Sequence, residues 1–510
     1  MQEFEIKFQV PRERLAGLEA ELMSLPGSSR LRLRAHYHDT PGRHLARAGI
    51  ALRARQEGRR RVQTLKAAGE DVLSRFEHEL PLSAGMEVDP ARHAGTSGGE
   101  RLLAALASAG EPLGEVFRTD IWRRRAVLDT AAGRVELALD AGRIVSGRRD
   151  RPVAELEIEL LDGSAGAVLE TARTWVARHG LWLDVRSKAE RGDRLARGLE
   201  HVDAVRAEPV PHQGPPAARW REVLRGAVAH LLPNVAELCE DDAHPQSAGQ
   251  VHQVRVALRH LRTSLKAFRD WPGAPDRERG VVLSQRAATV FRALGGRRDQ
   301  DVMDGLLAPV LQEAGLPPVA WLRSVASEAT GRAPGDTQAA SGAFPEGASA
   351  GAVLRSPLAQ ELFLDLLELL HSDEPASGPW TAEDARAFAA RRLKRWHREV
   401  AGIGPLEDLD EAAMHDLRKR IKRLRYAVED LAPLCAGSGL KRYRRALAHA
   451  QDAFGRYNDA VTALARLQAG ADSASAWYAR GWLSGRLDGW RRDCEAALQA
   501  LAESPKFWKA

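Results

Sequence analysis

Cysteine is scarce in this sequence: Cys239, Cys435 and Cys494 are the three among 510 residues. Their wide separation excludes a disulfide framework and a cysteine-rich zinc site. The sequence also lacks an uninterrupted run of about 18 apolar residues, which excludes a membrane-spanning helix, so we expect no membrane partner. The first residues lack the basic and then apolar regions of a signal peptide, and we therefore expect a cytoplasmic protein.

The length suffices for two or three domains, and 44% apolar with 28% charged residues is the balance of a folded protein. Residues 204–217 contain four prolines and no periodic apolar pattern, which predicts an extended, solvated linker. Apolar residues recur mainly at every second position before this linker and every three or four positions after it. We therefore predict an α+β protein with an antiparallel β-rich domain at 1–203 and an all-helical domain at 218–505.

Six segments before the linker alternate between apolar and polar residues, which is typical of half-buried strands. They are residues 2–10, 49–55, 62–66, 75–80, 134–140 and 153–161. Helical patterns intervene at 11–25, 100–109 and 165–179.

Charged residues stack on one face of these strands. Glu3, Glu5 and Lys7 share a face of the first strand, and three glutamates share a face of segment 155–159. For a single strand, the ordinary interpretation is the polar outer face of a sheet packed on one core. Stacked carboxylates repel each other unless a cation lies between them, so a closed barrel that holds both charge sets inside explains the whole set better.

Such an interior has a defined chemistry. Arginine and lysine bind phosphate oxygens, arginine with two parallel hydrogen bonds. Carboxylate oxygens suit Mg²⁺ or Mn²⁺, which also bind phosphate and activate water. The pattern therefore predicts a metal-dependent site for a polyanionic phosphate chain.

The order of short motifs along residues 1–200 resembles the CYTH domain, the triphosphate tunnel metalloenzyme fold. The motifs are Glu3-Phe4-Glu5-Ile6-Lys7, Tyr37-His38-Asp39-Thr40-Pro41, Leu52-Arg53-x-Arg55, Leu65-Lys66, Arg75-x-Glu77-x-Glu79, Phe117-Arg118-Thr119-Asp120 with Arg123, Asp140-x-Gly142, Glu155-x-Glu157-x-Glu159 and Ser187-Lys188. The resemblance implies an eight-stranded antiparallel tunnel that binds triphosphates and hydrolyses or rearranges them with a divalent metal.

The same resemblance implies roles for individual residues. The implied metal ligands are Glu3, Glu5, Glu157 and Glu159. The implied phosphate-binding residues are Lys7, Arg53, Arg55, Lys66, Arg123 and Lys188, and the catalytic group is Lys7, Glu5 and Lys66. Further acids would orient the basic residues or add a second metal: Glu77, Glu79, Glu136, Asp140 and Glu155. Three arginines could equally lie outside the tunnel: Arg75, Arg118 and Arg125.

The helical half contains a duplicated pattern. His252-x2-Arg255-x3-Arg259-x2-Arg262 recurs about 160 residues later as His415-x2-Arg418-x3-Lys422-x2-Arg425. A second pair of motifs, Leu294-Gly295-x2-Arg298-Asp299 and Phe454-Gly455-x2-Asn458-Asp459, repeats at nearly the same offset. Each basic stripe steps by three and four along a helix beside an apolar seam, with no acid among its members, which indicates an anionic ligand.

This half resembles the CHAD domain, the conserved-histidine α-helical domain. The resemblance implies two pseudo-symmetric four-helix bundles whose basic face binds inorganic polyphosphate. The implied polyphosphate-binding residues are His252, Arg255, Arg259, Arg262, His415, Arg418, Lys422 and Arg425.

We therefore expect a metal-dependent inorganic triphosphatase that converts tripolyphosphate to pyrophosphate and phosphate, with Mg²⁺ or Mn²⁺ as cofactor and long-chain polyphosphate as a second partner. Alternatives are a hydrolase or cyclase acting on thiamine triphosphate, another nucleoside triphosphate or ATP, and a non-catalytic polyphosphate-binding protein associated with granules. Nucleic acid is not an expected partner, because no helix-turn-helix, zinc module or aromatic-interleaved sheet accompanies the basic stripes.

Overall fold

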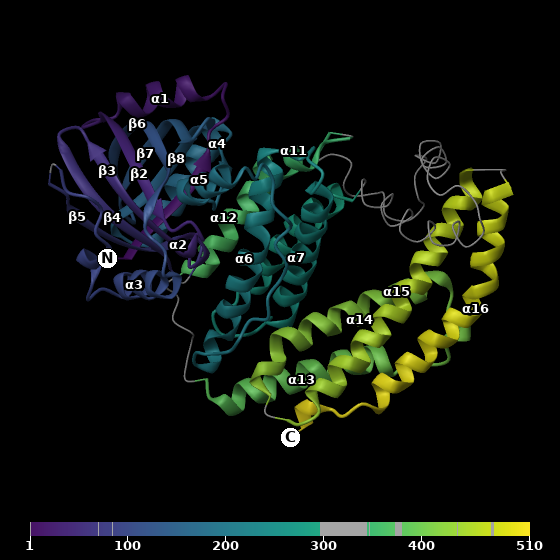
Figure 1. The fold of residues 1–510 in the computed structure, drawn as a ribbon. Helices are drawn as coiled ribbons and strands as arrows, with labels where there is room; N and C mark the ends of the chain where they lie inside the picture. The colour runs from purple at the N-terminus through teal and green to yellow at the C-terminus, as the bar shows by residue number, and fades with distance from the viewer. Residues whose placement is uncertain are drawn as a thin grey trace. The chain divides into compact units, whose positions relative to one another are not determined.

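The computed structural model describes residues 2–69, 71–83, 85–295, 344–345, 347–372, 380–435, 437–470 and 474–509, and Figure 1 shows its strands and helices. The chain forms two compact units. The first comprises Met1–Arg206, Val228–Val254 and Ser349–Asp373, and the second comprises Ala207–Ala227, Arg255–Ala348 and Glu374–Ala510. Portions of several helices therefore belong to the same compact unit as the strands.

The strands of the described chain form one antiparallel sheet. They are β1 (Gln2–Gln9), β2 (Ser29–Asp39), β3 (Ile50–Glu57), β4 (Arg60–Ala68), β5 (Ser74–Pro81), β6 (Gly114–Thr130), β7 (Gly133–Ser146), β8 (Arg149–Gly163) and β9 (Trp182–Leu183). Their order is β5-β4-β3-β2-β6-β7-β8-β1-β9, and β5 also pairs with β1. The first eight strands thus close into a barrel, which confirms the predicted α+β class with its eight-stranded antiparallel tunnel.

The alternation along each strand separates a charged interior from an apolar exterior. In β1, Glu5 and Lys7 are buried inside the barrel, whereas Ile6 and Phe8 are fully buried on its outer face. Helix α4 (Ala165–His179) covers that outer face by packing on β1 and β8. The charged faces seen in the sequence therefore point inward, because helices bury the opposite faces.

The pattern located most elements of the barrel unit but missed β2, β6 and β9. The predicted helices correspond to α1 (Leu15–Ser24), α3 (Ser97–Ala109) and α4. Consecutive arginines at 123–125 interrupt the alternation in the middle of β6. The sheet also carries two further short helices, α2 (His44–Arg47) and α5 (Lys188–Arg197).

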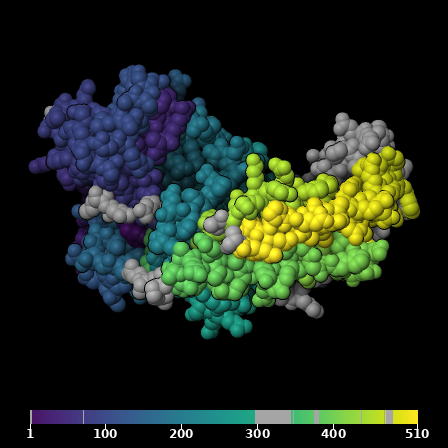
Figure 2. All heavy atoms as spheres, turned by 90° about the horizontal axis from the view of Figure 1, so that it is seen from below, coloured from purple at the N-terminus to yellow at the C-terminus, as the bar shows by residue number. Residues whose placement is uncertain are grey.

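The remaining described elements are helical. They are α6 (Arg219–Glu240), α7 (Ser247–Ala267), α8 (Arg277–Ala293), α11 (Ala350–Arg355), α12 (Pro357–His371), α13 (Ala382–Ala401), α14 (Glu411–Leu431), α15 (Leu440–Gly470) and α16 (Ala474–Glu503). Helices α13 to α16 pack on one another, and Figure 2 shows the yellow α16 running alongside the green helices of its unit. No helix of the described residues has the length and apolar character needed to cross a bilayer.

The predicted apolar seams of the duplicated helices are confirmed. All their side chains are buried: Val254, Leu258, Leu261, Leu265 and Phe268 along α7 and just beyond it, and Met414, Leu417, Ile421, Leu424 and Val428 on α14. In the second pair of repeated motifs, Arg298 and Asp299 lie outside the described residues.

Two buried side chains of α6 form hydrogen bonds with the backbone of the Pro-rich segment 204–217. The backbone of Val205 exchanges two hydrogen bonds of 3.0 Å with the side chain of Asn234. Further along, the guanidinium of Arg219 donates to the carbonyl oxygens of Val210 (3.0 Å) and Pro211 (3.1 Å). Buried polar side chains of α6 thus bind the backbone of this segment at three positions, although most of its residues are exposed.

Helices α7 and α14 are joined by a buried polar contact. His260 Nε2 lies 2.8 Å from Asp430 Oδ1, and the hydroxyl of Ser264 donates to Asp430 Oδ2 at 2.6 Å. The imidazole of His260 also stacks on Tyr426, with 4.5 Å between ring centroids. Burial opposes protonation, but the Asp430 carboxylate outweighs it and raises the pKa of His260 above its ordinary value.

This contact predicts that the free energy of unfolding falls as the pH rises. The contribution of His260 is fully present below its unfolded-state pKa of about 6.5 and is lost as the pH passes the higher folded-state pKa. Urea unfolding between about pH 5.5 and 8.5 should show a larger decrease in the parent than in His260→Gln. Parallel curves for the two proteins would contradict the assignment.

Candidate active site in the barrel interior

The barrel encloses a cavity of about 700 Å³. This volume lies within the range of about 300–1,000 Å³ that is common for small-molecule sites. All ten residues for which the sequence implied metal or phosphate binding in the tunnel line it: Glu3, Glu5, Lys7, Arg53, Arg55, Lys66, Arg123, Glu157, Glu159 and Lys188. The barrel thus brings together side chains from β1, β3, β4, β6, β8 and α5.

Three carboxylates lie side by side across β1, β8 and β7, and we call them the carboxylate row. Glu5 of β1 is the direct register partner of Glu159 of β8, which in turn is the partner of Glu136 of β7. All three line the cavity. Directly opposed side chains have Cβ atoms about 4.5–5.5 Å apart, so their charges repel strongly in a buried interior.

The pKa values in this region are set first by burial and then by neighbouring charges. Burial raises the pKa of Glu159 to about 7, with Lys66 opposing the shift and Glu5 and Glu136 reinforcing it. Burial likewise raises the pKa of Glu3 to about 8, against the attraction of Lys66. For Glu5, burial is outweighed by the ammonium of Lys7, so its pKa lies below the ordinary value.

These carboxylates have the donor chemistry that a hard divalent cation requires. They offer several oxygens in one buried place, and the protein's own cations neutralise them only in part. Glu3, Glu5 and Glu159 therefore fit the implied role of metal ligands.

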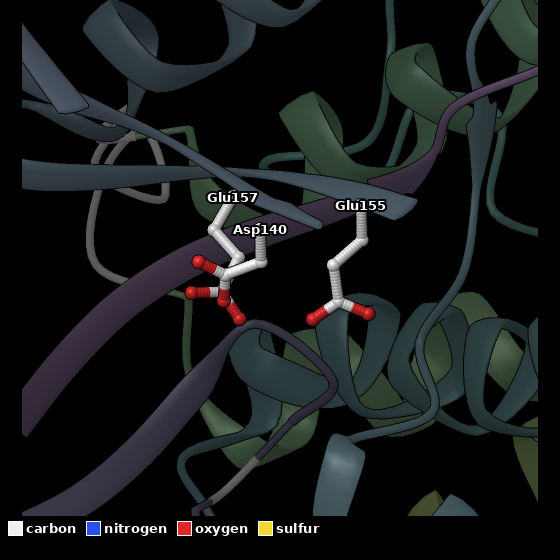
Figure 3. Close-up of side chains that lie close together, drawn as sticks. All are labelled: Asp140, Glu155 and Glu157. Carbon is white, nitrogen blue, oxygen red and sulfur yellow. The ribbon is translucent and has the colours of Figure 1, made fainter. Parts of the chain in front are cut away.

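A second acidic group is organised differently. One carboxylate oxygen from each of Asp140, Glu155 and Glu157 lies within 4.8 Å of the others, and Figure 3 shows Asp140 and Glu157 close together with Glu155 beside them. Arg123 donates two hydrogen bonds of 2.7 Å to Asp140 and also contacts Glu157. Lys188 lies 2.6 Å from Asp140 and 3.0 Å from Glu157, and it contacts Glu155.

The carboxylates of this second group contact basic side chains of the protein. Burial raises the pKa of Asp140 and of Glu157, but Arg123 and Lys188 outweigh burial and hold both pKa values below the ordinary range. Asp140 and Glu155 contact basic residues, which favours the first of the two alternatives that the sequence left open, and a role at a second metal stays a prediction. Glu157, an implied metal ligand, is bonded to Arg123 and Lys188, and its role at a metal stays a prediction.

Several cations line the cavity wall on β3 and β4. Lys66 lies 2.7 Å from Glu3 and 2.9 Å from Glu77, and Arg55 donates to Glu79 at 3.0 Å. The Nε atoms of Arg53 and Arg55 and the hydroxyl of Thr64 are buried without a hydrogen-bond partner in the described chain. The two arginines line the cavity, and their Nε atoms fit an anionic ligand, because buried N–H groups are otherwise nearly always paired.

Sequence reasoning assigned no role to Tyr37, although it lines the cavity. Its hydroxyl accepts a 3.0 Å hydrogen bond from Arg53, and its ring stacks on Phe117 with 4.4 Å between centroids. Apolar residues alternate with polar ones along β2, which places Tyr37 on the same face as Ala35. This alternation was the signal that could have identified it. Of the three arginines left open, Arg75 and Arg125 line the cavity, and the side chain of Arg118 is exposed.

The basic stripe of α7 lies against an aromatic ring. The guanidinium of Arg255 is 4.3 Å from the ring centroid of Phe291 and that of Arg259 is 5.2 Å away, both within cation–π range. Burial, followed by the charges of Arg292 and Arg259, lowers the pKa of Arg262. The cations of the first copy therefore lie close enough to lower the pKa of Arg262 by repulsion.

The members of the α14 stripe contact acids and an amide. Arg418 lies 3.5 Å from Asp459, Arg425 lies 2.9 Å from Glu429, and His415 contacts Asn458. No acid stands among the named members of this stripe, but Asp459 and Glu429 approach it from α15 and from the next turn of α14. Asp459 belongs to α15 and approaches α14 only when the two helices pack.

Comparisons with known protein families agree with this architecture. Residues 1–192 match the family model described as the CYTH domain, and residues 222–468 match the one described as the CHAD domain. Both resemblances drawn from the motifs are thereby confirmed.

Each individual relative matches only part of this chain and has a sequence identity of 30% or less. An inorganic triphosphatase of Haemophilus influenzae is 30% identical over 159 residues, which are 31% of this chain and 44% of the relative, so the match spans less than half of that protein. The crystal structure of the CHAD domain from Ricinus communis is 24% identical, covers 60% of this chain and 98% of its own, and has a TM-score of 0.45. A Hippeastrum structure described as revealing a dominant triphosphatase activity is 18% identical, covers 39% and 100%, and has a TM-score of 0.28.

The carboxylate row predicts a binding site for a divalent cation. Glu159→Gln keeps the shape of the side chain but removes its charge, so the affinity for Mn²⁺ should fall by at least ~10-fold. Titration calorimetry on the full chain measures this change. Glu361→Gln on α12 is the matched control, because it removes the same charge outside the cavity. Equal affinities of the parent and Glu159→Gln would contradict the site.

Proposed function

The chain joins a CYTH domain at residues 1–192 to a CHAD domain at residues 222–468, and from this premise we propose that it is a metal-dependent inorganic triphosphatase with a polyphosphate-binding helical module. One observation carries the proposal: a single buried cavity holds a partly neutralised carboxylate row beside guanidinium groups whose Nε atoms have no partner in the described chain. A chain of phosphates with bound metal complements both parts.

Tripolyphosphate would be bound by the cations that line the cavity, which come from five strands or helices. They are Lys7, Arg53, Arg55, Lys66, Arg123 and Lys188. Asp140 and Glu157 hold Arg123 and Lys188 in place before the substrate arrives, so little reorganisation is needed when negative charge develops in the transition state. Phosphoryl transfer depends mainly on such positioning and charge neutralisation.

When bound at Glu3, Glu5 and Glu159, Mg²⁺ or Mn²⁺ would supply further neutralisation of the phosphoryl oxygens and a Lewis-acidic site for water. No side chain of the cavity needs to act as a nucleophile. Glu5, Glu3 and Glu77 outweigh burial and raise the pKa of Lys66 above its ordinary value, so this lysine stays protonated and acts by binding phosphate. Lys7 or a carboxylate then remains to accept the proton of the attacking water.

The assignment predicts that the full chain releases phosphate from tripolyphosphate with Mg²⁺ or Mn²⁺, and faster than from ATP, thiamine triphosphate or long-chain polyphosphate. Glu5→Gln removes one charge of the carboxylate row and should lower kcat by ~100-fold or more with the fold intact. A colorimetric phosphate assay with far-UV circular dichroism measures both. Undiminished activity of Glu5→Gln at saturating metal would sink the tunnel mechanism.

The cations provide a second arm of the same experiment. Lys66→Ala and Arg55→Ala remove charge-assisted bonds to phosphate and should chiefly raise KM, by ~10-fold or more each. A preference for an organic triphosphate in the assay would instead favour the alternative hydrolase or cyclase. Binding of tripolyphosphate without turnover would favour a non-catalytic scaffold.

The proposed polyphosphate site lies along the basic stripes of α7 and α14. In the first copy, Arg255 and Arg259 lie over Phe291, and burial with the charges of Arg292 and Arg259 lowers the pKa of Arg262. Asp459 and Glu429 already attract Arg418 and Arg425 in the second copy. We therefore infer that both stripes contribute to the affinity.

Charge reversal tests this inference. Arg259→Glu with Arg262→Glu should weaken binding of long-chain polyphosphate by at least ~10-fold and reduce its salt dependence. Arg442→Glu with Arg445→Glu is the control, because it changes the net charge equally at exposed positions of α15. Fluorescence anisotropy with labelled polyphosphate measures the affinity. Displacement of the polymer by duplex DNA at equal phosphate concentration would favour the nucleic-acid interpretation.

A further inference from the structure

A buried ionic network lies directly before the phosphate-binding Lys188. Arg186 is 2% exposed and donates to both carboxylate oxygens of Asp184, at 2.9 and 2.7 Å. Its remaining nitrogen donates to Glu237 at 3.0 Å and to Glu240 at 2.7 Å, both on α6. All these residues belong to the first compact unit, so a helix of the helical half completes the charge balance of a tunnel segment.

The same segment is fastened to the barrel and to a second helix. The backbone N–H of Asp184 donates to the carbonyl oxygen of Lys7 at 3.0 Å. The side-chain amide of Gln9 donates to the carboxylate of Asp184 at 3.0 Å. The N–H of Leu183 donates to the side chain of Gln360 on α12 at 2.8 Å. The chain leading into Lys188 is thus held between β1 on one side and α6 and α12 on the other.

Glu237 reaches both ends of the helix that carries Lys188. It accepts hydrogen bonds from Arg186, just before α5, and from Arg194, in its last turn. Between these two arginines, Lys188 extends to Asp140 and Glu157 in the cavity wall, and Arg191 contacts Glu155. Losing one member of such a network leaves an uncompensated buried charge, and the segment that carries it must rearrange.

We propose that Glu237 of α6 is a positioning residue, which fixes the position of Lys188 in the tunnel through Arg186 and Arg194. A helix of the helical half would thereby control how Lys188 binds phosphate. The proposal rests on the proposed binding of phosphate by Lys188. Its physical content is that α6 supplies the anionic counterpart of two arginines that flank the lysine. A displacement of α6 would therefore move a phosphate-binding cation.

A second ionic contact of the same unit provides a comparison. Arg173 of α4 reaches Glu361 at 2.6 Å, Asp365 at 2.8 Å and Glu368 at 2.8 Å, all on α12. This contact also joins a helix of the barrel to a helix of the helical half. None of its members lines the cavity, so it stabilises the unit without touching the phosphate site.

The test uses the full chain and compares two neutralising substitutions. Glu237→Gln should raise KM for tripolyphosphate by ~10-fold and change kcat by less than ~3-fold, because a ground-state phosphate contact is misplaced. Asp365→Asn, which neutralises an acid of the Arg173 contact, should leave both constants unchanged. If Glu237→Gln does not fold, Glu240→Gln tests the contact of α6 with Arg186 at a more exposed position. Equal constants for Glu237→Gln and the parent would overturn the proposal.

A double-mutant cycle separates positioning from general destabilisation. In a Lys188→Met background, Glu237→Gln should raise KM no further, because the residue that it positions is gone. If the increase in KM of the double variant equals the product of the two single increases, Glu237 acts independently of Lys188, and the proposal is overturned.

Hydrogen exchange supplies a readout that does not depend on activity. Amides of residues 182–190 should exchange at least ~10-fold faster in Glu237→Gln than in the parent and remain protected in Asp365→Asn. If the parent neither binds nor hydrolyses tripolyphosphate, the proposed function fails, whereas this measurement still decides whether α6 holds the segment. Unchanged exchange in Glu237→Gln would overturn the coupling even in an active enzyme.

Discussion

The arrangement of this protein depends on burying many charges inside one barrel. Ionised groups can be buried only when opposite charges or a bound ion compensate them. The strand register decides which groups meet: it sets Lys7 opposite Glu157, an attractive pair, but sets Glu5 opposite Glu159, which repel. The described barrel is therefore compensated along one part of its wall and only partly compensated along another, and that imbalance indicates where a metal and a phosphate chain would fit.

The same constraint extends into the helices. Arg186 is buried at the end of the barrel, and the acids that complete its compensation come from α6. At the crossing of α7 and α14, Asp430 compensates His260. Within the first compact unit, charge compensation thus links α6 and α12 to segments that the sequence places in the barrel half.

The sequence predicted those features that depend on local periodicity. The alternation of Glu3, Glu5 and Lys7 shows which side chains share a face, and the motif order indicated a closed tunnel. The sequence could not predict contacts made by packing between distant segments. Glu237 looks like an ordinary polar position on a helix, and its partner Arg186 lies 51 residues away. Asp459 likewise approaches Arg418 only when α14 and α15 pack together.

The central claim is that the barrel interior binds a triphosphate together with a divalent metal. A crystal structure of the full chain with tripolyphosphate and Mn²⁺ tests it most directly, because anomalous scattering locates the metal. The account predicts an anomalous peak at coordination distance from Glu5 and Glu159, with phosphate oxygens bonded to Arg53 and Lys188. Metal and phosphate found only outside the cavity, on the surface of the barrel or along the helices, would contradict it.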